Sequence, residues 1–192
     1  NTPVATVAGA VAAAQKAGYG EGDTVNVKAI KAEGTIAWGT VSAYAFALNI
    51  SSVNADDKAT LHVGSLSGDV VIGNINLDNN SNTGNIDLLG NSITLDKGAV
   101  TGGSATIDLG KSNGQTIAKT QNVIINNDFH SSIVIGHNGQ GSHTWNKDLN
   151  IIVNSASAAP KISFQTYWGG TKTINGNFNI ILNENAAITF GT

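Results

Sequence analysis

Residues 68–99 read GDVVIGNINLDNNSNTGNIDLLGNSITLDKGA, and this stretch decides the fold class of the chain. Apolar and polar residues alternate in short runs, as in Ile86-Asp87-Leu88, and glycine or asparagine separates the runs. A period of two with apolar residues on one side is the pattern of a β-strand that buries one face. Such runs continue to residue 192 without a helical pattern between them. The sequence therefore predicts an all-β domain.

The spacing of these strand–turn units favours a parallel β-helix, with a β-sandwich as the alternative. Units that begin near Gly68, Gly84, Gly102 and Asn122 are 16, 18 and 20 residues apart. Such intervals suit the coils of a β-helix, in which each coil buries its apolar face by stacking on the next. Asparagine tolerates the backbone angles of turns, and stacked asparagine side chains can form ladders between coils.

The same alternation assigns single side chains to the core or to solvent. Over residues 105–109 it places Ile107 inside and Asp108 outside. Between residues 42 and 50, large residues on one face alternate with alanines on the other. We expect a strand of that composition to be covered on both faces.

Residues 2–17 have the pattern of a short helix. Thr2 can cap its N-terminus, Pro3 suits its first position, and Gly18 provides a stop. Three valines recur at helical spacing: Val4, Val7 and Val11. We therefore divide the chain into an N-terminal helix or arm with a turn, residues 1–23, and a β-solenoid domain, residues 24–192.

The N-terminal arm is too short to hold a helix unaided, so its apolar residues must pack against something. Two arrangements are open. The arm folds back onto its own β domain, or it packs on another copy of the chain and builds a filament. In the second arrangement the expected self-assembly residues are Val4, Val7, Val11, Tyr44 and Phe46.

Composition excludes several classes of function. Charged residues make up 12 % of the chain, about half the usual fraction. All ten basic residues are lysines and the net charge is −3, which argues against nucleic-acid binding. Cysteine is absent, so there is no thiolate nucleophile.

The longest apolar stretch, residues 36–50, is too short for membrane insertion. The chain starts at Asn1, and we interpret it as a mature or excised segment.

Two weak metal-binding patterns occur. A zinc site would group His130, His137 and His143, but their spacing matches no familiar zinc motif. A calcium site would use Asp78 in DNNSNTG, residues 78–84, where the bidentate glutamate of such loops is missing. We favour exposed loop histidines and a polar turn, and expect no cofactor.

The sequence offers few candidate residues for catalysis or ligand binding. β-Helices host polysaccharide-degrading enzymes, but here the carboxylates are scattered and no arginine is present to hold a uronate group. We therefore expect no enzymatic activity.

Tyr167 and Trp168 are adjacent, so they cannot both point inward on a regular strand. We expect one of them to be an exposed contact for a glycan or a protein.

Residues 60–192, and above all the stretch quoted first and GNFNIILNENAAITFGT at residues 176–192, resemble passengers of bacterial autotransporters and filamentous haemagglutinins. This resemblance implies an exported right-handed β-helix that adheres, coats or aggregates. We expect an extracellular, structural or adhesive protein of the bacterial cell surface, with a host or matrix surface as partner. The alternatives are a self-assembling subunit of a filament or surface layer and a polysaccharide-degrading enzyme.

Overall fold

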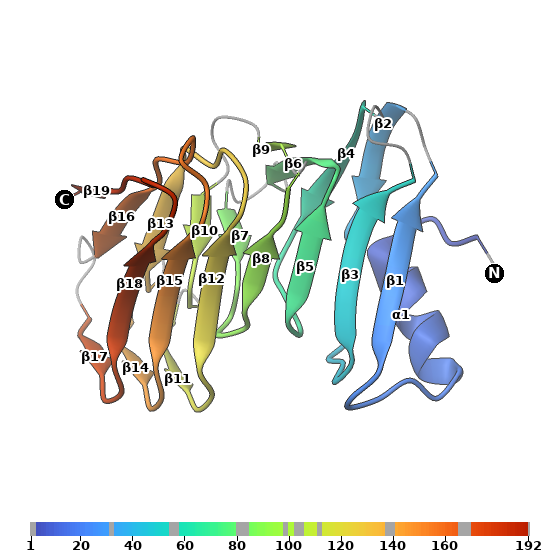
Figure 1. The fold of residues 1–192 in the computed structure, drawn as a ribbon. Helices are drawn as coiled ribbons and strands as arrows, with labels where there is room; N and C mark the ends of the chain where they lie inside the picture. The colour runs from blue at the N-terminus through green and yellow to red at the C-terminus, as the bar shows by residue number, and fades with distance from the viewer. Residues whose placement is uncertain are drawn as a thin grey trace.

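The computed structural model describes residues 3–30, 33–53, 58–79, 85–97, 100–101, 106–110, 113–136, 141–164 and 170–191. Within these ranges the chain is mostly β, with one short helix, and every strand pairing is parallel (Figure 1). The parallel pairing is compatible with a parallel β-helix and differs from the antiparallel pairing of a β-sandwich.

The strands of the described ranges form four sheets. A seven-stranded sheet has the order β1 (Thr24–Ala29), β3 (Ala47–Ser52), β5 (Val70–Gly73), β8 (Ile93–Leu95), β12 (Gln121–Ile125), β15 (Leu149–Val153) and β18 (Phe178–Leu182). A five-stranded sheet has the order β19 (Thr189–Gly191), β16 (Lys161–Phe164), β13 (Ser132–Ile135), β10 (Thr106–Asp108) and β7 (Asn85–Asp87). A four-stranded sheet consists of β2 (Glu33–Ala37), β4 (Lys58–Val63), β6 (Asn76–Asn79) and β9 (Val100–Thr101). A three-stranded sheet consists of β11 (Gln115–Ile117), β14 (His143–Trp145) and β17 (Lys172–Ile174).

The chain visits these sheets in turn. From β12 it runs through β13 and β14 and returns to the first sheet as β15, which pairs with β12. We call such a stretch, from one strand of the seven-stranded sheet to the next, a pass. Stacked residues on neighbouring passes are 23 positions apart for Asn26 and Asn49, and 28 apart for Asn122 and Asn150. Shorter separations of stacked residues also occur, 16 for Thr60 and Asn76 and 21 for Asn85 and Thr106. The intervals of 16, 18 and 20 residues read from the sequence therefore do not mark a single repeat.

Apolar columns in the core run through the stacked passes. In the five-stranded sheet, Ile86, Ile107, Ile133 and Ile162 stand in register, and each is fully buried. The predicted placement of Ile107 in the core is therefore confirmed. Burying an isoleucine stabilises a fold by about 1.5–3 kcal/mol, so repeated columns of this kind supply much of the stability.

Asp108, predicted to face solvent, is fully buried instead. Its Oδ2 accepts a 2.8 Å hydrogen bond from Nδ2 of Asn85 on the preceding pass. Val134 and Ser163 lie on the following strands of the same sheet and are also buried. The outer side of this sheet is thus covered at these positions, and alternation along one strand could not reveal that cover.

The helix α1 (Val7–Lys16) begins later than predicted. Thr6, in an extended conformation, is its N-cap, and the Thr6 Oγ1 accepts a 3.0 Å hydrogen bond from the Gly9 N–H. Thr6 also forms an isolated parallel bridge with Ala37, and Pro3, Val4 and Ala5 belong to no helix, whereas the predicted cap Thr2 lies outside the described residues. The predicted stop is confirmed, because Gly18 takes a φ of 90° just after the helix.

The arm folds back onto its own chain. The Ala8 N–H donates to the Trp38 carbonyl at 2.9 Å, and the Gln15 side-chain amide donates to the Ala43 carbonyl at 2.7 Å. In Figure 1, α1 lies beside β1 at the N-terminal end of the sheets. Val7 and Val11 belong to the same buried hydrophobic cluster as the strands.

The packing of the arm places four of the five expected self-assembly residues against their own chain. Val7, Val11 and Phe46 are buried within their own chain, and Tyr44 is half-buried with its hydroxyl bonded to the Asp69 carbonyl. Of the five, only Val4 is exposed. Val7, Val11, Tyr44 and Phe46 thus have partners within their own chain. The expected cover on both faces of residues 42–50 is also wrong, because Ala43, Ala45 and Ala47 are exposed.

Candidate functional site

Two columns of polar side chains run along the outward face of the seven-stranded sheet. The first column contains Asp69, Ser92, Asn122, Asn150 and Asn179, and the second contains Asp96, Asn126, Asn154 and Asn183. We call them the asparagine columns. They arise because β12, β15 and β18 are each part of an Asn-apolar-Ile-apolar-Asn segment in the same register. Stacked asparagine side chains therefore form hydrogen-bonded ladders between these strands.

Hydrogen bonds join each column from end to end. In the second column, Nδ2 of Asn154 donates to Oδ1 of Asn126 at 2.7 Å, and Nδ2 of Asn183 donates to Oδ1 of Asn154 at the same distance. At the head of this column, Nδ2 of Asn126 donates to Oδ1 of Asp96 at 3.3 Å. A carboxylate can only accept, so Asp96 orients Asn126 with its amide nitrogen toward the preceding pass. Every later amide in the column then has the same orientation.

A row of isoleucines separates the two columns. Ile124, Ile152 and Ile181 are in register on β12, β15 and β18 and point outward, with Ile181 43 % exposed. These strands therefore present a regular face of amides and apolar side chains without a charged residue. Such a face suits contact with a neutral polar surface, and it lacks a charged group for acid–base chemistry.

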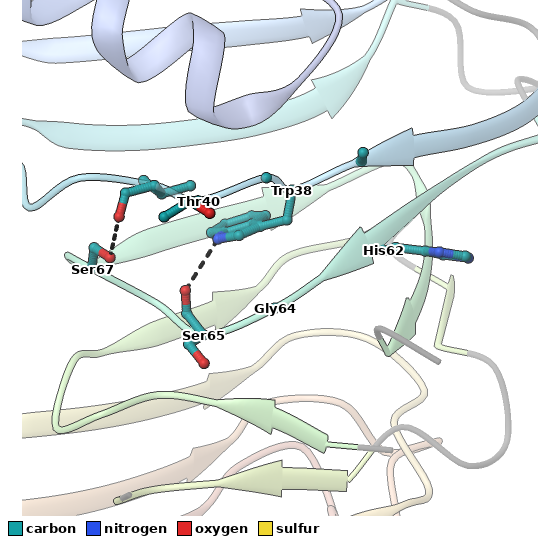
Figure 2. A pocket seen from close by; sticks show the side chains of 9 residues that line it. Trp38, Thr40, His62, Gly64, Ser65 and Ser67 are labelled. Carbon is teal, nitrogen blue, oxygen red and sulfur yellow. Dashed lines mark hydrogen bonds between the residues drawn. The ribbon is translucent and has the colours of Figure 1, made fainter. Parts of the chain in front are cut away.

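A separate hollow of about 560 Å³ lies between the segments that follow β2 and β4. Figure 2 shows the indole of Trp38 within it, with Nε1 donating a 3.1 Å hydrogen bond to the Ser65 carbonyl. The Ser67 hydroxyl donates to the Val41 carbonyl at 2.7 Å. These polar groups hold the two segments together, which leaves few of them available for a ligand.

The hollow does not assemble a nucleophile and a base. The Ser65 hydroxyl donates to Oδ2 of Asp87 at 3.2 Å, and Nε2 of His62 lies 3.6 Å from Oδ2 of Asp78. Figure 2 shows the imidazole of His62 pointing away from the hydroxyls of Ser65 and Ser67. A serine–histidine pair needs the hydroxyl within hydrogen-bond reach of the imidazole, and the orientation of His62 does not provide that.

The structure separates the described metal candidates. His143 is on β14 in the three-stranded sheet, Asp78 is on β6 in the four-stranded sheet, and His130 is an exposed residue after β12. Among the described residues, no group of three or more His, Cys, Asp or Glu side chains could hold a metal ion. His137 lies outside the described residues, as do Tyr167 and Trp168, the predicted contact pair.

His143 is fully buried, so its interpretation as an exposed loop residue is wrong. Its ring stacks on that of Trp145 with centroids 5.9 Å apart. Nε1 of Trp145 donates a 2.7 Å hydrogen bond to Oε1 of Gln121, which is itself buried. Gln121 in turn donates to the carbonyls of Asn91 and Leu109, each at 2.9 Å. This polar network is part of the core, and the period-two pattern offered no signal for it.

Burial shifts the pKa of two side chains. It raises the pKa of Tyr44 well above 10.0, and the nearby Asp69 carboxylate adds to the shift. Burial also lowers the pKa of Lys172, whose Nζ donates to the Gly141 carbonyl at 3.3 Å. Both groups hold parts of the scaffold together, since the Tyr44 hydroxyl donates to the Asp69 carbonyl at 3.1 Å and Lys172 donates to that of Gly141.

No protein-family model, curated protein or solved structure matches this chain. Within the described ranges, no helix is long and apolar enough to cross a membrane.

Proposed function

We propose that this chain is a parallel β-solenoid module of an extracellular bacterial surface protein, with a structural and adhesive role and no catalytic activity. The observation that carries the proposal is the pair of asparagine columns on a stack of parallel strands. Side chains that are hydrogen-bonded from pass to pass make a rigid flank, and rigidity is what a display scaffold requires. The resemblance of residues 60–192 to surface passengers points to the same role.

Adhesion would use the outward face of β12, β15 and β18. Its amides can exchange hydrogen bonds with a neutral glycan or matrix surface, and its isoleucine row adds apolar contact area. Because this face has no charged side chain, its binding should depend little on salt.

Substitution of the face tests the adhesive role. Ile152→Lys places a charge in the middle of the face, and Thr144→Lys is a matched control at an equally half-buried position on the three-stranded sheet. We expect Ile152→Lys to reduce binding of the purified protein to host cells or matrix-coated plates, and the control to bind like wild type. Equal binding by all three proteins would contradict adhesion through this face.

Location and catalysis need their own measurements. Antibodies against the folded protein should label intact producing cells as strongly as permeabilised ones. Labelling that requires permeabilisation would contradict the surface location. Release of reducing sugar from a panel of polysaccharides, lost in a heat-denatured sample, would contradict the non-catalytic role.

A further inference from the structure

We propose that the ligand of the outward face of β12, β15 and β18 is an extended, neutral, β-1,4-linked polysaccharide that lies along the isoleucine row, with each sugar ring over one pass. The proposal rests on the adhesive function and names the ligand class of that same face. The apolar faces of the sugar rings cover the isoleucine row, and the hydroxyl groups at both edges of the glycan bond to the two asparagine columns.

The outward side chains of β12 and β15 are open to solvent in the middle of the sheet. Asn150, Ile152 and Asn154 are half-buried, although β15 pairs with β12 on one side and with β18 on the other. Asn122 and Ile124 are half-buried in the same way on β12, which lies between β8 and β15. Figure 1 shows β12 and β15 side by side, with no described helix or strand in front of them. Their exposure is therefore a property of the outward side of the sheet.

Each amide within a column keeps hydrogen-bonding capacity for a ligand. Asn150 donates one of its two Nδ2 hydrogens to Oδ1 of Asn122, and its own Oδ1 accepts one bond, from Asn179. An amide group has two N–H donors and two acceptor lone pairs, so one donor and one lone pair of Asn150 remain. Asn154 is bonded in the same way in the second column. A sugar hydroxyl both donates and accepts, so it can use either group on each side of β15.

These groups are held in place before a ligand arrives. The bonds from pass to pass fix the orientation of each amide, and Asp96 sets that orientation for the second column. The isoleucines between the columns are β-branched and therefore stiff. Binding to such a face orders few side chains, which lowers its entropic cost.

The dimensions of the face fit a single extended glycan. Neighbouring strands are about 4.8 Å apart, so Ile124 and Ile152 repeat at about this distance along the row. Each ring of a β-1,4-linked glycan advances the polymer by a similar length, which keeps rings and passes in step. Asn150 and Asn154 are four residues, or about 13 Å, apart along one pass. A hydrogen bond of about 2.8 Å at each edge leaves roughly 7 Å, about the width of a pyranose ring across its hydroxyl oxygens.

The charge of the face favours a neutral polymer over an acidic one. No residue at positions 122–126, 150–154 or 179–183 is charged. A uronate or sulfate group on this face would lose hydration without gaining a counter-charge, which is unfavourable. Sugar hydroxyls also lose hydration, but the amides replace those hydrogen bonds. A neutral glycan is therefore complementary to the face in both charge and hydrogen bonding.

The test probe is cellohexaose, a soluble hexamer of β-1,4-linked glucose, titrated against the full chain in a calorimeter. Maltohexaose is the matched control, because it has the same sugar, length and neutrality but α-1,4 linkages that curl the oligosaccharide. We expect cellohexaose to bind at least about tenfold more tightly than maltohexaose. No binding of cellohexaose, or equal binding of the two hexamers, would overturn the proposal. Both titrations use the unmodified protein, so their outcome does not depend on the folding of a variant.

Two variants locate the binding on the face. Ile152→Lys places a charge in the isoleucine row, and Thr144→Lys is its control at a half-buried position on the three-stranded sheet. We expect Ile152→Lys to weaken cellohexaose binding at least about tenfold and Thr144→Lys to leave it unchanged, with both proteins retaining the wild-type circular dichroism spectrum. Equal weakening by the two variants would place the glycan elsewhere and contradict the proposal.

Failure of the glycan proposal can be told apart from failure of the adhesive function. If Ile152→Lys reduces adhesion to cells or matrix-coated plates while cellohexaose does not bind, the face is adhesive toward another ligand, such as a protein, and the glycan proposal is wrong. If cellohexaose binds as expected while Ile152→Lys leaves adhesion unchanged, the glycan site stands and adhesion through this face is contradicted.

Discussion

Nδ2 of Asn183 donates a 2.7 Å hydrogen bond to Oδ1 of Asn154, which stands 29 positions earlier in the sequence and one pass away in space. Asn154 makes the same bond to Asn126, so a single side chain links three passes. A residue that donates to one neighbour and accepts from the other couples their positions, and its removal should therefore affect both contacts.

The first prediction concerns this coupling. Asn154→Ala removes two side-chain hydrogen bonds and should lower the free energy of unfolding by about 1–3 kcal/mol. Asn26→Ala is the control, since Asn26 is exposed on β1 and accepts a single bond, from Asn49. The measurement is the urea midpoint of each variant. Equal midpoints for the two variants would show that the column contributes no stability of its own.

A second prediction tests which side chains of β10 face the core. Ile107→Asp places an unpaired carboxylate in a fully buried column and should cost more than about 4 kcal/mol or prevent folding. Ile107→Val, which leaves a measurable protein, should cost about 0.5–1.5 kcal/mol. Asp108→Ala should also destabilise, because it removes the hydrogen bond that Nδ2 of Asn85 donates to the buried carboxylate. A neutral Asp108→Ala in denaturant unfolding would mean that this carboxylate is solvated.

The third prediction concerns alkaline pH. The folded-state pKa of Tyr44 is raised above its unfolded value of 10.0, so unfolded chains lose this proton first. The stabilisation is complete below pH 10.0 and is lost as the pH rises above it, at up to about 1.4 kcal/mol per pH unit. Tyr44→Phe should show a shallower loss of stability between pH 9 and about pH 11. The free energy of unfolding is measured in urea at each pH. If it falls equally with pH in the two proteins, the raised pKa of Tyr44 is contradicted.

A fourth prediction concerns close packing at Gly110. A Cβ at this position would overlap the imidazole of His143, so Gly110→Ala should cost about 1–3 kcal/mol. His143→Ala removes the obstacle, and Gly110→Ala should be milder in that background. A double-mutant cycle measures the coupling. Additive free energies would show that the ring of His143 is not what excludes the side chain.

The fifth prediction concerns divalent metal. Because His130, His143 and Asp78 lie on separate elements, excess EDTA should leave the melting temperature unchanged. A fall of more than about 10 °C exceeds what one weak site supplies and would require a metal site with other ligands.

Alternation along single strands was sufficient to predict the all-β class and much of the core. The placement of Ile107 in the core and of Phe46, Leu48 and Ile50 on one buried side followed from a period of two. This succeeds because neighbouring side chains on a strand point to opposite faces, which is a local property of the backbone. The helix was predicted from another local pattern, the helical spacing of its valines, although its N-cap was placed at Thr2, four residues before the observed cap Thr6.

Tertiary structure alone decided which residues meet across passes. Asn126, Asn154 and Asn183 are unremarkable turn residues in the sequence, and only the register of β12, β15 and β18 joins them into a column. The burial of His143 and Asp108 and the folding back of Val7 likewise depend on neighbours far along the chain. Local periodicity specifies the face on which a side chain lies, whereas its partners depend on how many residues each pass contains. In the seven-stranded sheet that number varies from 22, between Leu48 and Val70, to 30, between Ile93 and Val123, so no fixed repeat in the sequence reveals it.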